Sequence, residues 1–250
     1  MAGPLATVPV LELAVEGVSG VRLAASVGAA RVELCAALSE TEGITPSIGT
    51  VAQACEIGLP VHVLVRPRSG DFTYSAAEFD VLERDVVAVI RAGAVGIVVG
   101  VIAADGGPDV RATRRLAAAA REQYPAAEVT FHRAFDTVLA SGFDAAEALR
   151  RLAESGVDRV LTSGGATDCA AGLATLGELV ALGREHAPSV QVMAGGGVTP
   201  EIVPALVRSG VHAVHTSARP RGLGAARTDQ PDLAFARSIA TALTLGGPVS

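Results

Sequence analysis

Acidic, basic and imidazole side chains recur at the downstream ends of short apolar segments of this sequence. A carboxylate or a guanidinium inside an apolar strand is costly to bury unless it is paired, and carboxylates and imidazoles are the usual carriers of general acid–base chemistry. We therefore predict catalytic roles for one set of these side chains. They are Glu12, Glu33, Arg66, His132, Arg133, Asp136 and His215.

Two interpretations of this set stay open. In the enzymatic one, His132 exchanges a proton with the substrate and is oriented by Asp136 or Glu33. Arg66 then binds an anionic group of the substrate, because a guanidinium can hold a carboxylate or phosphate with two parallel hydrogen bonds. In the structural interpretation, Arg66 and Arg133 are the partners of the two glutamates in a buried ion-pair layer.

A run of three glycines, Gly195, Gly196 and Gly197, is predicted to bind a phosphate or another small anion. Glycine lets a ligand approach the backbone N–H groups closely. Barrels of alternating strands and helices often bind phosphate with the loops that follow their last two strands. Hydroxyl and guanidinium groups at neighbouring segment ends complete the predicted anion site, namely Ser163, Ser217 and Arg219. The alternative is a tight turn that only leads into a helix near Thr199.

The three cysteines, Cys35, Cys55 and Cys169, are far apart and form neither a CxxC motif nor a disulfide framework. Cu(I) prefers thiolate and thioether ligands, and Cys35 is the one cysteine at the end of a predicted strand. We therefore predict that any copper site is weak and rests on Cys35. The histidines and glutamates named above are also metal-ligand types, but no HxH motif occurs in the first apolar segment.

Eight apolar, β-branched segments recur about thirty residues apart, the length of a strand–helix repeat. We predict strands at residues 8–15, 30–35, 60–67, 95–102, 128–135, 158–163, 190–195 and 212–217. Helical segments lie between them, and several end in a glycine just before the next strand. The pattern predicts an α/β fold, a single (β/α)8 barrel over residues 1–250, whose strand ends bring the predicted side chains to one opening. A doubly wound open sheet is the alternative, but VEGVSGV is a poor match to the glycine-rich turn it needs.

Composition excludes several classes of protein. The 250-residue chain is half hydrophobic, with a mean hydropathy of +0.43, and contains no lysine. Without lysine there is no Schiff-base, pyridoxal phosphate or P-loop chemistry, and we expect no NAD or haem. A net charge of −6 and 3% aromatic residues argue against nucleic-acid binding. We also expect no signal peptide, no membrane span and a cytoplasmic location.

Several segments resemble the CutC family, which is named for copper homeostasis. They are RVELCAALSE with GITPS, RPRSGDFTYS, VTFHRAFD, DRVLTSGG, VMAGGGV and VHTSAR, and the likeness covers about residues 8–220. The resemblance implies a cytoplasmic (β/α)8 barrel, a homodimer and copper binding. The family often carries two adjacent cysteines after its first strand, where this chain reads LELAVEG, so Cys35 is the remaining thiol. Two functions follow: a copper homeostasis protein that binds copper, or an enzyme acting on a small anionic or phosphorylated substrate.

Overall fold

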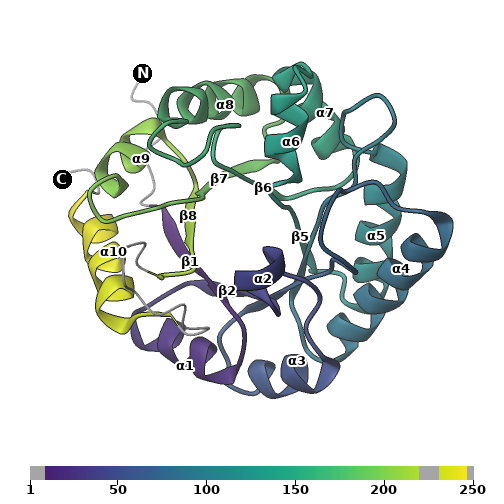
Figure 1. Cartoon of the computed structure of the whole chain (residues 1–250), viewed down its shortest axis with the longest axis horizontal. Helices are drawn as coiled ribbons and strands as arrows, with labels where there is room; N and C mark the ends of the chain where they lie inside the picture. Colours follow the sequence, from purple (N-terminus) through teal and green to yellow (C-terminus); the bar gives the residue numbers. More distant parts are fainter. Residues whose placement is uncertain (1–8, 220–230, 247–250) are drawn as a thin grey trace.

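The computed structural model describes residues 9–219 and 231–246 (Figure 1). Its centre is a closed barrel of parallel strands that pair in chain order, with β8 pairing back to β1. The strands are β1 Val10–Val15, β2 Arg31–Leu34, β3 Val61–Leu64, β4 Gly96–Val99, β5 Glu128–Phe131, β6 Arg159–Thr162, β7 Gln191–Gly195 and β8 Ala213–Thr216. The predicted (β/α)8 barrel is confirmed, and the doubly wound alternative is wrong. The predicted outer boundaries, residues 1 and 250, lie outside the described residues.

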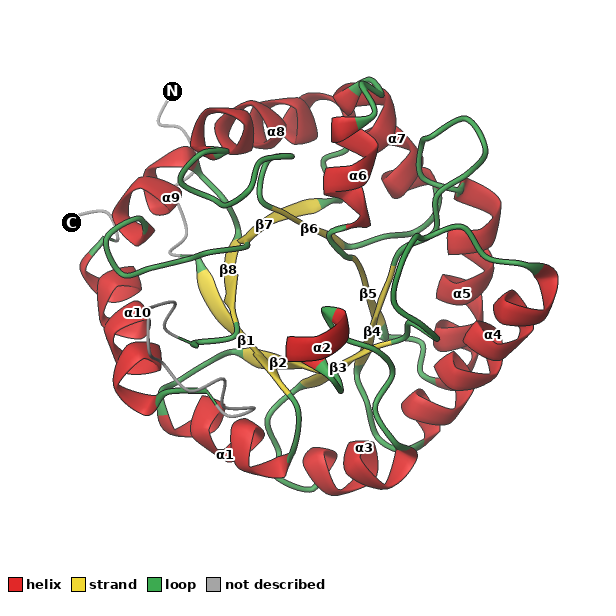
Figure 2. Ribbon diagram, in the orientation of Figure 1, coloured by secondary structure: helices red, strands yellow, loops and turns green. Residues whose placement is uncertain are grey.

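Helices surround the barrel in a ring, except for the short α2, which lies over the barrel opening (Figure 2). They are α1 Val18–Ser26, α2 Leu38–Thr41, α3 Ile48–Cys55, α4 Ala76–Arg91, α5 Val110–Gln123, α6 Ala134–Ala140, α7 Ala145–Glu154, α8 Leu173–His186, α9 Val203–Ser209 and α10 Leu233–Leu245. Local sequence sets their ends: Ser75 and Glu78 form a reciprocal capping box at the start of α4. After α4, Gly93 takes a φ of +108° and turns the chain towards β4. No helix among the described residues is long and apolar enough to cross a membrane.

Six of the eight strands end earlier than predicted, and the difference matters for the site. Residues 60–67 and 128–135 were predicted as strands, but β3 ends at Leu64 and β5 ends at Phe131. Arg66 and His132 therefore lie in the loops that leave the barrel. We call this C-terminal opening of the barrel the mouth; the short helix α2, in the connection after β2, lies across it (Figure 1).

The strand register arranges the inward-facing side chains in layers of four. Residues paired across parallel strands share a face, and each layer of such a barrel comes from alternate strands. From the N-terminal end upward, the register gives the layers Arg31, Gly96, Arg159 and Ala213; then Glu12, His62, Thr130 and Met193; then Glu33, Val98, Leu161 and His215; then Ala14, Leu64 and Gly195. His132, two residues after Thr130, continues the interior face of β5 from the loop that follows it. The outer faces of the strands carry the main apolar core under the helices.

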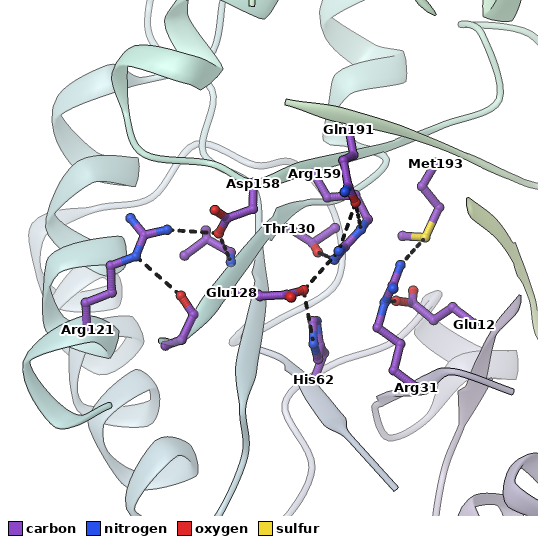
Figure 3. Close-up of polar contacts among 12 residues, drawn as sticks. Glu12, Arg31, His62, Arg121, Glu128, Thr130, Asp158, Arg159, Gln191 and Met193 are labelled. Atoms are coloured by element: carbon purple, nitrogen blue, oxygen red, sulfur yellow. Dashed lines mark hydrogen bonds and ion pairs between the residues drawn. The ribbon is translucent and has the colours of Figure 1, made fainter. Parts of the chain in front are cut away.

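Polar contacts fill the N-terminal end of the barrel (Figure 3). Arg159 donates hydrogen bonds to Thr130 Oγ1 at 3.2 Å, Glu128 Oε2 at 2.9 Å and Gln191 Oε1 at 3.1 Å. His62 Nε2 lies 3.6 Å from the same Glu128 oxygen. This network occupies the barrel interior below the site, and the buried Nδ1 of His62 has no hydrogen-bond partner among the described residues.

Candidate functional site

Glu12, Glu33 and His215 form a buried cluster at the base of the mouth. His215 Nδ1 lies 2.7 Å from Glu12 Oε1 and 3.7 Å from Glu33 Oε2. Arg31 Nε donates to the other oxygen of Glu12, and its Nη2 lies 3.5 Å from the sulfur of Met193. Glu33 Oε2, in contrast, has no hydrogen-bond partner among the described residues. The sequence analysis brought the two glutamates and His215 to the same end of the barrel, and there they meet.

Little of this cluster is accessible to solvent. Glu12 is fully buried, whereas 8% of the Glu33 side chain and 12% of the His215 side chain remain accessible. The layer above them contains Ala14 and Gly195 on the β1 and β7 strands, and neither has a side chain long enough to cover the cluster. A Cβ on Gly195 would lie 2.5 Å from Leu161 and 3.1 Å from His215, so glycine is required there.

The environment separates the pKa values of the two carboxyl groups. The pKa of Glu33 is raised to about 7. Burial is the largest cause, the positive charge of His215 opposes it, and the negative charge of Glu12 acts in the same direction as burial. Burial would also raise the pKa of Glu12, but the His215 hydrogen bond and the charge of Arg31 hold that pKa well below its ordinary value. Burial disfavours charge on His215, yet the hydrogen bond to Glu12 and the charge of Glu33 raise its pKa. Near neutral pH, Glu33 is therefore the group that can both give and take a proton.

His132 lies in the loop after β5, and its ring is held on two sides. Its Nδ1 accepts a hydrogen bond of 3.0 Å from the Ala134 amide, and its ring centroid lies 4.9 Å from that of Phe72. A Cβ on Gly100 would lie 2.2 Å from the ring, so only glycine leaves room for it. The Ala134 amide, rather than the predicted Asp136 or Glu33, contacts Nδ1, and the buried Nε2 has no hydrogen-bond partner among the described residues.

Arg66 is bound to the backbone of two loops, which corrects its predicted role as a two-pronged anion clamp. Its Nη1 donates to the carbonyl oxygens of Thr41 at 2.9 Å and Gly43 at 3.1 Å, and its Nη2 donates to that of Gly70 at 3.0 Å. The Nε–H is buried and has no acceptor among the described residues. Arg66 therefore anchors the chain around α2 over the mouth and keeps one donor unused.

Asp136 and Arg133 form a separate network at the β5 and β6 ends. Asp136 accepts from the amides of Ser163 at 3.1 Å and Gly165 at 3.0 Å, and from the Thr162 hydroxyl. Arg133 Nε donates to Asp136 at 2.7 Å, and its Nη2 donates to Ser163 Oγ at 3.0 Å. Asp136 therefore fixes the loop after β6, while the Arg133 side chain beside it is 42% exposed.

The structure divides the predicted anion site into two parts. The Arg133 guanidinium lies against Gly196, where a Cβ would be 3.2 Å from its Cζ, and Ser163 is equally close. The amides of Gly196 and Gly197 have no acceptor in the described part of the chain. Arg219 instead donates to Ser39 Oγ at 3.0 Å and to a carboxylate oxygen of Glu16, beside α2. Ser217 lies in the loop after β8, which ends at Thr216.

Cys35 points into the barrel but is held in an apolar cluster with Leu64 and Val98, packed against Leu38 of α2. Its Sγ lies 3.6 Å from the Val15 carbonyl oxygen. Burial, together with the negative charge of Glu33, raises the pKa of the Cys35 thiol well above its ordinary value. A thiol in this setting is a poor source of the thiolate that Cu(I) requires.

Arg31 is the site residue that the sequence analysis missed. It lies two residues before Glu33 and so points to the same interior face of β2. This spacing was the available signal. Site residues were predicted only at the C-terminal ends of strands. Arg31 instead begins β2 and reaches Glu12 on the adjacent strand. Phe72, which contacts His132 and lies 5.1 Å from Arg66 Cζ, had no signal in the sequence pattern.

Comparisons with known proteins agree with this architecture. A CutC family protein from Klebsiella pneumoniae is 42% identical over 210 residues, which are 84% of this chain and 80% of the relative. Another from Caulobacter vibrioides is 40% identical over 208 residues, 83% of this chain and 80% of the relative.

Solved structures share the barrel. One, described as the copper homeostasis protein CutC from Streptococcus agalactiae, superposes with a TM-score of 0.73 at 25% identity and covers 84% of this chain and 98% of that one. The 3-hexulose-6-phosphate synthase of Salmonella typhimurium, with a TM-score of 0.60 at 16% identity over 95% of this chain and 99% of that one, shares the fold alone. The sequence model of the CutC family matches residues 9–220, and the chain therefore belongs to the CutC family.

Proposed function

We propose that this chain is an enzyme that transfers a proton on a small anionic substrate bound in the mouth of the barrel. The observation that carries the proposal is Glu33 Oε2, a buried carboxylate oxygen without a hydrogen-bond partner among the described residues and 3.7 Å from the His215 ring. Buried titratable groups with shifted pKa values at a strand end are typical of catalytic acids and bases.

The division of labour within the cluster supports this role. Glu12 has charged partners on both sides, Arg31 and His215, and is kept ionised. Glu33 lies beside the same imidazole but without a partner of its own, so its proton is the one available to a ligand entering from the mouth. Environments that push two carboxyl pKa values apart assign different roles to chemically identical groups.

Anion binding is assigned to the wall formed by Gly196, Gly197 and Arg133. The two glycine amides have no acceptor in the described part of the chain, and the Arg133 guanidinium packs against Gly196 with 42% of its side chain exposed. Backbone N–H groups together with a guanidinium are a suitable donor set for phosphate or carboxylate.

Copper binding is the second candidate, because the relatives' names connect the family with copper homeostasis. A tight Cu(I) site does not fit the residues present: Cys35 offers one buried thiol of raised pKa. The oxygen and nitrogen atoms of Glu12, Glu33 and His215 lie within 4.8 Å of one another. Glu12 is already bound by Arg31 and His215, and the Arg31 charge would repel a cation, so we assign the cluster to proton transfer. A part in copper homeostasis requires no resident copper ion.

The cytoplasmic location and the homodimer implied by the family resemblance stay predictions. The free cysteines Cys35, Cys55 and Cys169 are compatible with a reducing compartment.

Nuclear magnetic resonance of protein with 13C-labelled glutamate carboxyl groups tests the proposal. We expect one carboxyl signal with a midpoint near pH 7 that is absent from Glu33→Gln and present in Glu185→Gln, a control at an exposed carboxylate. Inorganic phosphate should shift the amide signals of Gly196 and Gly197. A Glu33 midpoint near its ordinary value would overturn the acid–base role, and unmoved glycine amides would overturn the anion site.

A further inference from the structure

His132 has a fixed tautomer. Its Nδ1 lies 3.0 Å from the Ala134 amide nitrogen, and a backbone amide can only donate, so Nδ1 is the unprotonated, accepting nitrogen. The proton of the neutral ring is therefore on Nε2. That nitrogen is buried and has no partner among the described residues. A buried N–H donor without an acceptor is unfavourable, and here it is aimed by a backbone contact rather than left to rotate.

A second unused donor lies nearby. Arg66 donates hydrogen bonds from Nη1 and Nη2 to three carbonyl oxygens. Its buried Nε–H has no acceptor in the described part of the chain. Phe72 contacts both groups: its ring centroid is 4.9 Å from that of His132 and 5.1 Å from Arg66 Cζ. Both residues are more than nine-tenths buried. Two N–H donors of this kind are complementary to an oxygen atom that carries or gains negative charge.

The strand register relates these donors to Glu33. His132 follows β5 two residues after the inward-facing Thr130, so it continues the interior face above the layer that contains Glu33 and His215. The interior layer above Glu33 also contains the small residues Ala14 and Gly195, and 8% of the Glu33 side chain is exposed, although its Oε2 is buried. Glu33 therefore lies below His132 along the barrel axis.

We propose that the Nε2–H of His132, assisted by the Nε–H of Arg66, binds the carbonyl oxygen of the substrate, and that the reaction is proton transfer at the carbon next to that carbonyl. The substrate class is a small aldehyde or ketone that also carries a phosphate or carboxylate. This inference rests on the acid–base role proposed above for Glu33 and names the chemistry at the same site.

The step balances without an oxidant or a further reactant. Glu33 takes a proton from the carbon beside the carbonyl; the electron pair of the broken C–H bond forms a C–C double bond, and the carbonyl electron pair moves to oxygen. His132 and Arg66 stabilise the resulting enolate oxygen by hydrogen bonds. Return of a proton to the same carbon restores the carbonyl and completes an exchange. Burial and the charge of Arg66 lower the pKa of His132 to about 3, which keeps the ring neutral and Nε2 protonated.

The tautomer is tested on the free protein with 15N-labelled histidine. We expect the His132 signals of a neutral ring with the proton on Nε2 throughout pH 5–8, and a downfield shift of the Nε2 proton when oxalate, a planar dianion that resembles an enolate, is added. The control is His186, which lies at the exposed end of α8. A proton on Nδ1, a midpoint above pH 5, or no response of His132 to oxalate would overturn the inference.

The reaction is tested by hydrogen–deuterium exchange in D2O, with hydroxyacetone phosphate and pyruvate as probes and proton magnetic resonance as the readout. We expect enzyme-dependent loss of the C–H signals next to a carbonyl, reduced at least 100-fold in His132→Phe and in Glu33→Gln, but not in His186→Gln. His132→Phe keeps an aromatic ring against Phe72 and removes only the donor, and its fold is checked by circular dichroism.

The outcomes separate the two proposals. Exchange that is lost in Glu33→Gln but unchanged in His132→Phe would overturn the role of His132 and leave that of Glu33 standing. Exchange that persists in Glu33→Gln would overturn the acid–base role itself. No exchange with either probe would overturn the carbonyl substrate class, while the Glu33 titration described above still decides the acid–base role.

Discussion

At the scale of single residues, the cluster derives its chemistry from unequal pairing. Glu12 has two charged partners, whereas Glu33 shares one imidazole and keeps an oxygen unpaired. The free-energy cost of burying a charge is therefore offset by partners at Glu12 but not at Glu33. This asymmetry has a consequence for stability that can be measured without knowing the substrate.

Replacing Glu33 by Gln should change how the free energy of unfolding depends on pH. The pKa of Glu33 is raised to about 7 in the folded protein, above the ordinary value of 4.5. Its stabilising contribution is therefore complete below about pH 4.5 and is lost as the pH rises through 7, because the unfolded chain ionises more readily. Relative to Glu33→Gln, the wild type should lose at most about 3 kcal/mol across this interval.

Urea unfolding at half-unit pH steps measures the effect. Three further ionisable groups surround Glu33 or its neighbour His215 in both proteins, namely Glu12, His215 and Arg31. The informative quantity is therefore the difference in the free energy of unfolding between wild type and variant at each pH. Glu185→Gln, at an exposed carboxylate, should follow the wild type. A wild-type curve parallel to that of Glu33→Gln between pH 4.5 and 7 would show that Glu33 ionises normally.

Copper should bind weakly and through Cys35. One thiol of raised pKa cannot supply the two or three soft ligands of a tight Cu(I) site. Competition with a Cu(I)-specific chelator under anaerobic conditions measures the affinity of the wild type and of Cys35→Ser. Cys55→Ser is the matched control, because that thiol is on α3, outside the barrel interior. Tight stoichiometric binding that survives Cys35→Ser would contradict this expectation.

At the scale of elements, α2 was not predicted, and the reason is physical. Its four residues are too short for a helical period, and the residues on either side, Ala37 and Glu42, take left-handed φ values of 51° and 62°. Neither residue type prefers that conformation. Tertiary contacts impose it: Arg66 binds two carbonyl groups of this segment, Arg219 binds Ser39, and Glu16 accepts from the Leu38 amide. The segment is held over the mouth against local preference.

We therefore expect Glu42→Gly to leave the free energy of unfolding nearly unchanged and Glu40→Gly to lower it. Glu42→Gly relieves a left-handed φ that costs about 1 kcal/mol, which offsets the extra freedom that glycine gives the unfolded chain. Glu40 lies inside α2 and is exposed, so Glu40→Gly should reduce stability by up to about 1 kcal/mol. Thermal unfolding monitored by circular dichroism compares the two. Equal losses would show that the backbone at Glu42 stores no strain.

The strands and their order were predictable because the barrel is built from local repeats. Each apolar segment is buried on both faces, as in β6, and each is followed by a helix that returns the chain to the next parallel strand. The site was predictable only in part. The positions of the strand ends predicted the sites of Glu33, His132 and His215. Which side chains meet depends on the register between strands, and the sequence alone does not reveal it. Arg31 meets Glu12 because their Cα atoms pair across β1 and β2.

At the scale of the whole molecule, the barrel interior is polar at its base and partly polar below the mouth. Two buried arginines, Arg31 and Arg159, belong to the same interior layer and expose 7% and 3% of their surfaces. Their partners differ. Arg159 binds Glu128 and Gln191 at the N-terminal rim, where the Glu128 side chain is 47% exposed, while Arg31 binds Glu12, which solvent does not reach.

Removal of the two arginines should therefore have unequal effects. Arg31→Met leaves a carboxylate fully buried with His215 as its remaining partner, and breaking such a pair costs about 3–5 kcal/mol. Arg159→Met leaves Glu128 and Gln191, which water can reach, and the neutral hydroxyl of the buried Thr130, and the expected loss is about 1–3 kcal/mol. Methionine has a similar length in both cases, so packing is matched. Denaturant unfolding at pH 7 measures both losses. If Arg159→Met proved as costly as Arg31→Met, burial of Glu12 would not be what makes the Arg31 pair indispensable to the barrel.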